Sequence, residues 1–387
     1  MKILLLLLGF GVHSFCADGA AAADKEEAGC KRYRQIHLLD IPTCSRQRIS
    51  LLKETGGATL GQLQPLGEGR PTLRMVCHKG EATSLAFIDN TNMLVGTSTG
   101  AIEAWDYSSL RVAGLYKKHN GRVSALNVPH PDAFISGGTD GKVRIWDMRA
   151  SSFQQKLSCK GAVTALAYNG KDMQLAMGSN IEDPVTHRFG QGYLKIANLI
   201  GTYQIKQRLA EHSSFTAAYS QDGKYLFSDD DFWNSGLDVY SASADDYKTI
   251  ASISFGNNVT PSALAVCNTT LVAGLANLGE DNTTLMAWDI QDNAVPIKGK
   301  EFPVCDDIVL NVVACPAKNE LCTLHANRTN TRQRTIRVWR NGDVIQLIKE
   351  FPVSEYARHL AVTPDGSCVA YNNSNGFSIA QLEHDEL

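Results

Sequence analysis

The sequence predicts an all-β protein built from seven repeated units. Trp105 and Trp146, each followed by Asp, lie 41 positions apart, which indicates a repeat of about that length. Apolar and polar residues alternate along short segments, as is typical of strands that bury one face. Asp-Gly pairs such as the one at Asp140 separate these segments and predict hairpin turns. By itself the length of 387 residues predicts two or three domains, but the repeat indicates one continuous array of units instead.

Composition limits the classes of function. Hydrophobic residues make up 43% of the chain, which is enough to bury a core. The 37 Lys and Arg residues are balanced by 40 Asp and Glu residues, which gives a formal net charge of −3. This balance lacks the excess positive charge of a nucleic-acid-binding protein, so we expect no nucleic-acid partner.

The N-terminus has the pattern of a secretory signal peptide over residues 1–16. Lys2 precedes an apolar run at residues 3–12, and the small residues Ser14 and Cys16 occupy the positions expected before a cleavage site. The run is too short to cross a bilayer, which needs about twenty apolar residues. No later segment reaches that length, so we expect no membrane anchor.

The C-terminus supplies a second targeting signal. Its last four residues, His384, Asp385, Glu386 and Leu387, match the signal that a receptor reads to retrieve proteins to the endoplasmic reticulum. This signal acts only on a protein that has entered the secretory lumen, and residues 1–16 provide that entry. We therefore expect residence in the lumen of the endoplasmic reticulum. A cytosolic adaptor with misread termini is the alternative.

Residues 17–70 precede the repeats and are expected to form an N-terminal extension with a linker. Residues 17–29 are small and charged, whereas residues 30–52 carry apolar positions that could pack against the ring. Residues 56–69 have the composition of a linker.

The repeats extend over residues 71–383. Trp105, Trp146, Trp288 and Trp339 close four units, and degenerate units end near residues 197–198, 239–240 and 379–380. The last unit supplies only three strands. We expect residues 71–76 to provide its fourth strand and so to close the ring, which protects strand edges from pairing with other chains.

This pattern resembles the WD40 family of β-propellers, whose repeats span about 40–45 residues and form four strands per blade. The resemblance implies a seven-bladed propeller. It also implies that His119, Ser136, Asp140 and Trp146 form a buried hydrogen-bonded tetrad within one blade. We interpret His119 and Asp140 as structural rather than as a catalytic pair, because buried polar groups must satisfy one another.

Motifs for catalysis, cofactors or metal binding are missing from the sequence. Asp229, Asp230 and Asp231 form the one tight cluster of carboxylates in the sequence. This run indicates a solvated acidic loop rather than a cation site. The histidines do not have metal-ligand spacing. We therefore predict a protein that is not an enzyme and needs neither a cofactor nor a metal.

Enlarged loops indicate where a protein partner could bind. In a propeller, the loops between the second and third strands of each blade lie on one face. Four consecutive units enlarge this loop, at residues 180–192, 229–236, 276–284 and 326–335. Aromatic and arginine side chains anchor many protein interfaces. The candidates on this rim are His187, Arg188, Phe189, Phe232, Trp233, Arg328, Arg332 and Arg334. Alternatively, Phe232 and Trp233 pack beneath their own loop.

Five Asn-x-Ser/Thr sequons are candidate glycosylation sites: Asn258, Asn268, Asn282, Asn327 and Asn372. Asn282 and Asn327 fall on the enlarged loops, and Asn372 falls in the equivalent loop of the last unit. Glycans on all three would hinder docking on this rim. Either these sequons are unused, or a partner binds the opposite face or the side of the ring.

Cysteine pairing stays open at this point. Loss of Cys16 leaves nine cysteines, so at least one thiol has no partner within the chain. Cys315 and Cys322 flank a hairpin and could bridge its strands, and Cys30 and Cys44 could staple the extension. The alternative is that most cysteines are buried thiols.

Taken together, the sequence predicts a luminal scaffold for protein partners, with a role in folding or quality control. Proteins with this type of repeat mostly present binding surfaces, which is an inference from the fold alone. A luminal enzyme that uses the mouth of the propeller channel on glycans or proteins is a further alternative.

Overall fold

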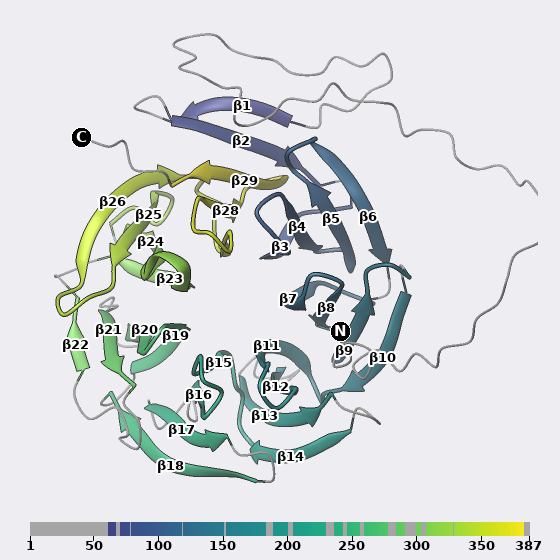
Figure 1. Ribbon diagram of the computed structural model, residues 1–387, viewed down its shortest axis with the longest axis vertical. Coiled ribbons are helices and arrows are strands. Elements are labelled where there is room, and N and C mark those ends of the chain that lie inside the picture. The colour runs from purple at the N-terminus through teal and green to yellow at the C-terminus, as the bar shows by residue number, and fades with distance from the viewer. Residues whose placement is uncertain are drawn as a thin grey trace, which may run out of the picture.

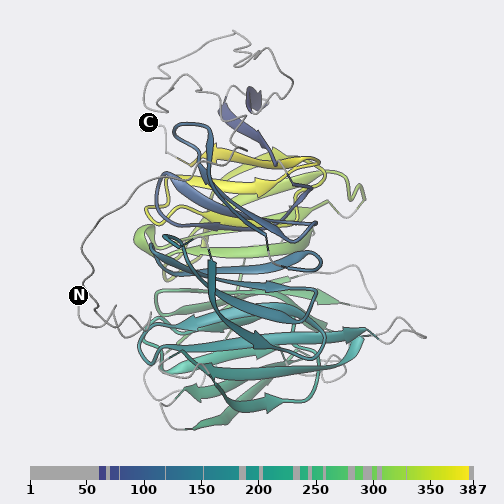
Figure 2. The same cartoon turned by 90° about the vertical axis from the view of Figure 1, so that its right-hand side faces the viewer.

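A computed structural model shows an all-β ring, which confirms the predicted fold class (Figure 1). The described residues form seven antiparallel sheets, the blades, arranged around a central axis. Figure 2 shows the same ring from its edge. The structure describes residues 61–66, 70–77, 79–117, 119–150, 152–182, 189–199, 204–229, 236–242, 246–255, 259–277, 284–290, 299–302, 307–327 and 329–382.

Blades 1 to 3 each contain four strands that run outward from the axis in chain order. Short polar turns connect the strands, so neighbours in sequence pair antiparallel. Their strands are β3 (Ala82–Phe87), β4 (Asn92–Thr97), β5 (Ala101–Asp106), β6 (Arg111–Lys117), β7 (Val123–His130), β8 (Ala133–Gly138), β9 (Lys142–Asp147), β10 (Ser152–Ser158), β11 (Ala162–Asn169), β12 (Gln174–Glu182), β13 (Phe189–Asn198) and β14 (Ile205–Ala210).

Blades 4 to 6 repeat this arrangement. A short 3-10 helix, η2 (Pro316–Lys318), follows the inner strand of blade 6. The strands are β15 (Ala217–Tyr219), β16 (Tyr225–Asp229), β17 (Gly236–Ala242), β18 (Tyr247–Ser254), β19 (Val259–Cys267), β20 (Thr270–Asn277), β21 (Thr284–Asp289), β22 (Gly299–Glu301), β23 (Ile308–Cys315), β24 (Glu320–Ala326), β25 (Arg334–Arg340) and β26 (Gln346–Val353).

Blade 7 joins the two ends of the propeller. Its strands β27 (Leu360–Val362), β28 (Cys368–Asn372) and β29 (Gly376–Gln381) come from the end of the chain, and β2 (Arg70–Val76) pairs with β29 as its fourth strand. The N-terminal strand thus closes the ring. The interpretation of residues 56–69 as a linker was wrong in one respect, because β1 (Gly61–Leu66) pairs with β2 as a fifth, outermost strand (Figure 1).

Hydroxyl groups on the inner strands tie neighbouring blades together. Thr83 sits in a β-bulge of β3, and its hydroxyl donates a hydrogen bond of 2.7 Å to the carbonyl of Val123 in blade 2. Ser124 and Ser262 occupy the same bulge position in β7 and β19, and each donates to a valine carbonyl of the following blade. The bulge is therefore a repeated device that sets the spacing between blades.

Apolar side chains fill the space between blades. Trp105, Trp146 and Trp288 are almost fully buried, and each closes the third strand of its blade. The cluster around Trp146 includes Leu94 of blade 1 as well as Phe134 of its own blade, so the core is continuous across the junction. Among the described residues, no helix has the length and apolar character that crossing a bilayer requires.

Candidate partner-binding surface

The four residues of the expected tetrad lie in one hydrogen-bonded chain within blade 2. His119 Nδ1 lies 2.9 Å from Asp140 Oδ1, and His119 Nε2 lies 2.7 Å from Ser136 Oγ. The indole nitrogen of Trp146 donates to the same serine oxygen at 2.8 Å. These contacts link the loop before β7 to the second and third strands of the blade.

The order Asp-His-Ser resembles a nucleophilic triad, but its environment does not suit catalysis. A working triad needs a serine oxygen that can reach a substrate. Ser136 is fully buried at 0% exposure, and its oxygen already accepts the hydrogen bond from Trp146. Burial lowers the pKa of His119. Arg144 Nη1 donates to Asp140 at 3.0 Å, so the carboxylate is held in a paired and desolvated position. The geometry supports the structural interpretation.

Blade 6 builds a similar chain that the sequence did not reveal. Trp339 Nε1 donates to Thr323 Oγ1 at 2.7 Å, and that oxygen lies 2.6 Å from His325 Nε2. Arg337, two positions before Trp339, lies 2.7 Å from Asp307 Oδ2. In blade 2, His119 lies just before the inner strand β7. In blade 6, Asp307 lies just before the inner strand β23. The spacing Arg-x-Trp, which occurs at Arg144 and again at Arg337, is the sequence signal that could have indicated this second network.

Other blades use shorter versions of the same contact. Trp105 Nε1 donates to Glu103 Oε2 at 3.0 Å, and the hydroxyl of Tyr240 donates to Asp238 Oδ2 at 3.1 Å. In both cases the carboxylate lies two positions before the aromatic residue on the same strand. Because the acceptor comes from its own strand, each aromatic polar group is satisfied locally.

Three of the eight predicted partner-binding residues lie among the described parts of the chain. Arg332 and Arg334 stand at the end of the loop between β24 and β25. Phe189 begins β13, where its backbone pairs with Glu182. The other candidates, His187, Arg188, Phe232, Trp233 and Arg328, lie outside the described residues.

Arg332 and Arg334 both reach the loop that leads into blade 7. The side chain of Arg332 is 85% exposed, and its Nε lies 3.9 Å from Glu355 Oε2. Such an exposed ion pair is weak, on the order of 0–1 kcal/mol, so this arginine can change partners easily. Arg334 Nε donates to the Glu355 carbonyl oxygen at 3.2 Å. Burial and the nearby charge of Arg358 lower the pKa of Arg334.

Further positive charge lies near the start of the inner strand of blade 7. His359 lies at the start of the inner strand of blade 7, and burial lowers its pKa to about 4, with further lowering by Arg122 and Arg358. Both arginines are exposed. Tyr356, on the same loop as Arg358, keeps 52% of its surface exposed. We call Arg122, Arg332, Arg334, Arg358 and Tyr356 the basic surface.

A buried asparagine holds the loop of the basic surface in place. Asn372 Oδ1 accepts hydrogen bonds from the backbone N–H groups of Arg358 at 2.7 Å and His359 at 2.9 Å. Its Nδ2 donates to the Tyr356 carbonyl oxygen at 2.9 Å. Since the side chain is only 7% exposed, this three-bond clamp is shielded from water. It fixes the positions from which Tyr356 and Arg358 project.

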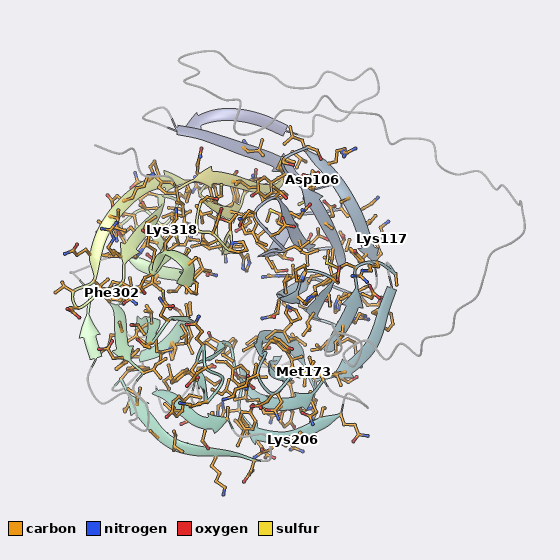
Figure 3. All side chains as sticks on the ribbon, viewed as in Figure 1. Asp106, Lys117, Met173, Lys206, Phe302 and Lys318 are labelled. Atoms are coloured by element: carbon orange, nitrogen blue, oxygen red, sulfur yellow. The ribbon has the colours of Figure 1, made fainter. Side chains whose placement is uncertain are left out.

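A hollow of about 210 Å³ lies among residues of the inner strands and the segments that lead into them. Figure 3 shows the side chains of the described residues on the ring. Ser84, Ser124, Thr164, Phe215, Asn311 and His359 are among its lining residues. His359 is the one titratable side chain among the described residues that line it. Among the described residues, no cluster of three His, Cys, Asp or Glu side chains could hold a metal ion.

The proposed pairing of Cys315 with Cys322 is wrong. The register of the hairpin sets Cys322 opposite Val313 and Cys315 opposite Glu320, so the two cysteines are diagonal neighbours. Diagonal positions in a sheet lie about 7–8 Å apart, beyond the usual range of a disulfide. Both thiols are free and buried. Cys30 and Cys44 lie outside the described residues.

Comparison with known proteins supports the repeat assignment. Residues 110–147 match the family described as WD domain, G-beta repeat. This segment contains β6 and most of blade 2, including the complete tetrad.

Three curated proteins are similar over short stretches. The chain is 34% identical over 73 residues to p21-activated protein kinase-interacting protein 1-like of Xenopus laevis, which covers 18% of this chain and 20% of that protein. It is 30% identical over 95 residues to Mitochondrial division protein 1 of Mycosarcoma maydis, or 24% of this chain and 12% of that protein. It is 29% identical over 84 residues to ASTRA-associated protein 1 of Verticillium alfalfae, or 21% and 20%. The matched stretches thus span a fifth or less of each relative's length.

Proposed function

We propose that this WD40-type propeller is a non-enzymatic scaffold in the lumen of the endoplasmic reticulum that binds an acidic segment of a protein partner. Two of the similar proteins are named for interaction or association with other proteins, which is in keeping with a scaffold. We place its task among folding or quality-control functions, because those require resident luminal proteins that contact other chains.

The observation that carries the binding part is the basic surface. Four arginines from blades 2, 6 and 7 lie on or near the loop at residues 355–359, which also bears the exposed Tyr356, and Glu355 of this loop pairs with Arg332. Arginine and tyrosine are enriched at the energetic centres of protein interfaces. Carboxylates of a partner would form charge-assisted, bidentate hydrogen bonds with the guanidinium groups. The fixed loop at Asn372 limits the entropy lost on binding.

The location part rests on the two terminal signals. Residues 1–16 would direct entry into the secretory pathway, and His384 to Leu387 would return the protein through the retrieval receptor. Expression of the native chain with and without residues 384–387 tests this part. We expect cell retention with the tail and secretion without it. A native chain that keeps Met1 and stays in the cytosol would reject the luminal location.

Charge reversal tests the binding part. Crosslinking followed by mass spectrometry on tagged protein in cells should identify proteins that contact the basic surface. We expect the double variant Arg332→Glu/Arg358→Glu to lose these crosslinks at least tenfold while the thermal unfolding temperature stays the same. Lys248→Glu is the matched control, because Lys248 is 74% exposed and lies on the outer strand β18. Equal crosslinking by both variants would reject the basic surface as the binding site.

A further inference from the structure

Three of the five sequon asparagines, Asn268, Asn327 and Asn372, lie within the described residues. We propose that Asn327 carries a glycan in the folded protein and that Asn268 and Asn372 stay unmodified. The proposal rests on the luminal location proposed above. It is argued from the amide nitrogen Nδ2 of each asparagine, because this atom forms the bond to the sugar. The nitrogen loses a proton and attacks C1 of an oligosaccharide donor, which releases its phosphate-linked carrier. The modified nitrogen then carries a bulky group and keeps one hydrogen.

Asn372 cannot carry a sugar in this fold. Its Nδ2 donates to the Tyr356 carbonyl oxygen at 2.9 Å, and the side chain is buried beneath the loop of the basic surface. The sequon hydroxyl is also engaged, since Ser374 Oγ accepts a hydrogen bond from Arg74 at 3.3 Å. A glycan at Nδ2 would have to displace the loop that contains Arg358. Occupied molecules would therefore not reach the structure described here.

Asn268 is engaged in a similar way on the opposite face of the ring. Its Nδ2 donates to Asn319 Oδ1 at 2.8 Å, in the small cluster of amides that joins blades 5 and 6. The sequon hydroxyl belongs to Thr270, which is 5% exposed and accepts a hydrogen bond from Asn341 at 3.1 Å. The Asn268 amide nitrogen and the Thr270 hydroxyl, which glycosylation would require, are thus both used in hydrogen bonds between blades.

Asn327 has the opposite arrangement. Its Oδ1 accepts hydrogen bonds from the backbone of Thr329 at 3.0 Å and of Asn330 at 3.0 Å, as in an Asx-turn. The hydroxyl of Thr329 donates to the same oxygen at 2.8 Å, and Thr329 is exposed. Because all three bonds end on Oδ1, the turn is complete without Nδ2. Among the described residues, no hydrogen bond uses that nitrogen.

The position of this glycan bears on docking. Asn327 begins the loop between β24 and β25, whose other end bears Arg332 and Arg334. A glycan there borders the basic surface on the side of blade 6. With Asn372 unmodified, the part of the basic surface beside blade 7, with Arg358 and Tyr356, stays open. Glycans at both Asn327 and Asn372 would hinder docking on this part of the ring. A single glycan at Asn327 lies at the edge of the basic surface and leaves the rest of it accessible to a partner.

Site-specific occupancy tests the proposal. The full mature chain is expressed behind a foreign secretory signal, so its entry into the lumen does not depend on its own N-terminus. The folded protein is isolated by size-exclusion chromatography, and glycosidase treatment in heavy-oxygen water marks each formerly occupied asparagine for peptide mass spectrometry. We expect the mark at Asn327 and none at Asn268 or Asn372. A bare Asn327, or a mark at either of the other two in folded protein, would overturn the proposal.

Matched variants give an independent readout. Thr329→Ala and Asn327→Gln should each lose one glycan step on a gel, whereas Thr329→Ser should keep it because serine preserves the sequon. Asn268→Gln and Asn372→Gln should leave the glycan pattern unchanged and lower the thermal unfolding temperature. Loss of a glycan from either of these two variants would contradict the assignment. Failure of the native signal to direct secretion would reject the proposed location without affecting this result.

Discussion

Gly137 lies so close to Val163 of the next blade that a Cβ atom built on the glycine would be 2.4 Å from Val163 Cγ1. Gly137 belongs to the second strand of blade 2, and Val163 belongs to the inner strand of blade 3. Real Cβ atoms do not approach other atoms this closely, so a side chain here would force the blades apart. The same contact recurs at Gly96 with Val123 (2.6 Å) and at Gly274 with Val309 (2.7 Å).

Replacement of Gly137 by alanine should therefore destabilise the ring. We expect a loss of about 1–3 kcal/mol in the free energy of unfolding, as is usual when a well-packed core is overfilled. Urea denaturation measures this loss. Gly342→Ala is the control, because its Cβ would meet its first neighbour at 3.6 Å, an ordinary contact. Addition of Val163→Ala should recover part of the loss, since it removes the methyl groups that clash. Strict additivity of the two substitutions would contradict the proposed contact.

The hydroxyl of Thr323 should be essential to blade 6. Thr323→Val keeps the shape of the side chain but leaves the Trp339 indole N–H and the His325 ring nitrogen without their shared partner. A buried polar group without a partner costs about 1–3 kcal/mol. Thr323→Ser retains the hydroxyl and should cost less than Thr323→Val. Equal unfolding free energies for both variants would show that the chain of hydrogen bonds contributes nothing to stability.

Acid should destabilise the protein through its buried histidines. Burial, followed by the charge of Arg337, lowers the pKa of His325 to about 3, and burial lowers the pKa of His359 to about 4. The unfolded chain takes up these protons near pH 6.5, before the folded chain does. Their stabilising contribution is therefore complete above pH 6.5 and declines as the pH falls toward 4. His325, which is fully buried, contributes a slope of up to about 1.4 kcal/mol per pH unit.

Comparison of the wild type with His325→Gln isolates this effect. The variant cannot be protonated at that position, so its unfolding free energy should fall less steeply between pH 6.5 and 4.5. Asp229 acts in the opposite direction, because burial raises its pKa to about 6 and its protonation below that pH favours the folded state. Both proteins share this contribution, so it cancels in the difference. Identical slopes for the two proteins would contradict the role of His325.

The sequence predicted the ring because its repeat signals are local. The Trp-Asp ends, the Asp-Gly turns and the tetrad of blade 2 each depend on residues within one repeat. The network of blade 6 could not be predicted from the motif of blade 2, because His325 lies on the second strand two positions after Thr323, whereas His119 precedes the inner strand of its blade. Similar hydrogen-bonding groups therefore stand at different positions of the repeat, and the sequence motif is lost.

Two further contacts depend on residues that the sequence does not bring together. Cys315 and Cys322 flank one hairpin in the sequence, but a register offset of two residues separates them, and register is set by packing on both faces. The clamp at Asn372 could not be predicted because the partners of its side chain lie on a loop more than ten positions away in the sequence. The sequence alone contains no local record of either contact.

The buried thiols should resist modification in the folded protein. Burial raises the pKa of Cys159 and Cys267 to about 11, and raises that of Cys322 still further, so few thiolates exist at neutral pH. We expect iodoacetamide to label Cys368 first among the six described cysteines, because it is partly buried whereas the other five are buried. After unfolding in urea without a reductant, Cys315 and Cys322 should both be labelled. Protection of that pair would indicate a disulfide and contradict the structure.

Loss of the asparagine clamp should loosen the basic surface without removing any of its charges. Asn372→Ala deletes three hydrogen bonds to the backbone of Tyr356, Arg358 and His359, each worth about 0.5–1.5 kcal/mol. We expect faster hydrogen exchange at residues 356–359, by at least tenfold, and fewer crosslinks to the partner although Arg358 is still present. Asn372→Asp keeps the acceptor for two N–H groups and should fall between alanine and the wild type. Unchanged exchange in Asn372→Ala would mean that the loop is held by its other contacts, and the basic surface would then owe its geometry to packing around Ala357 and Leu360.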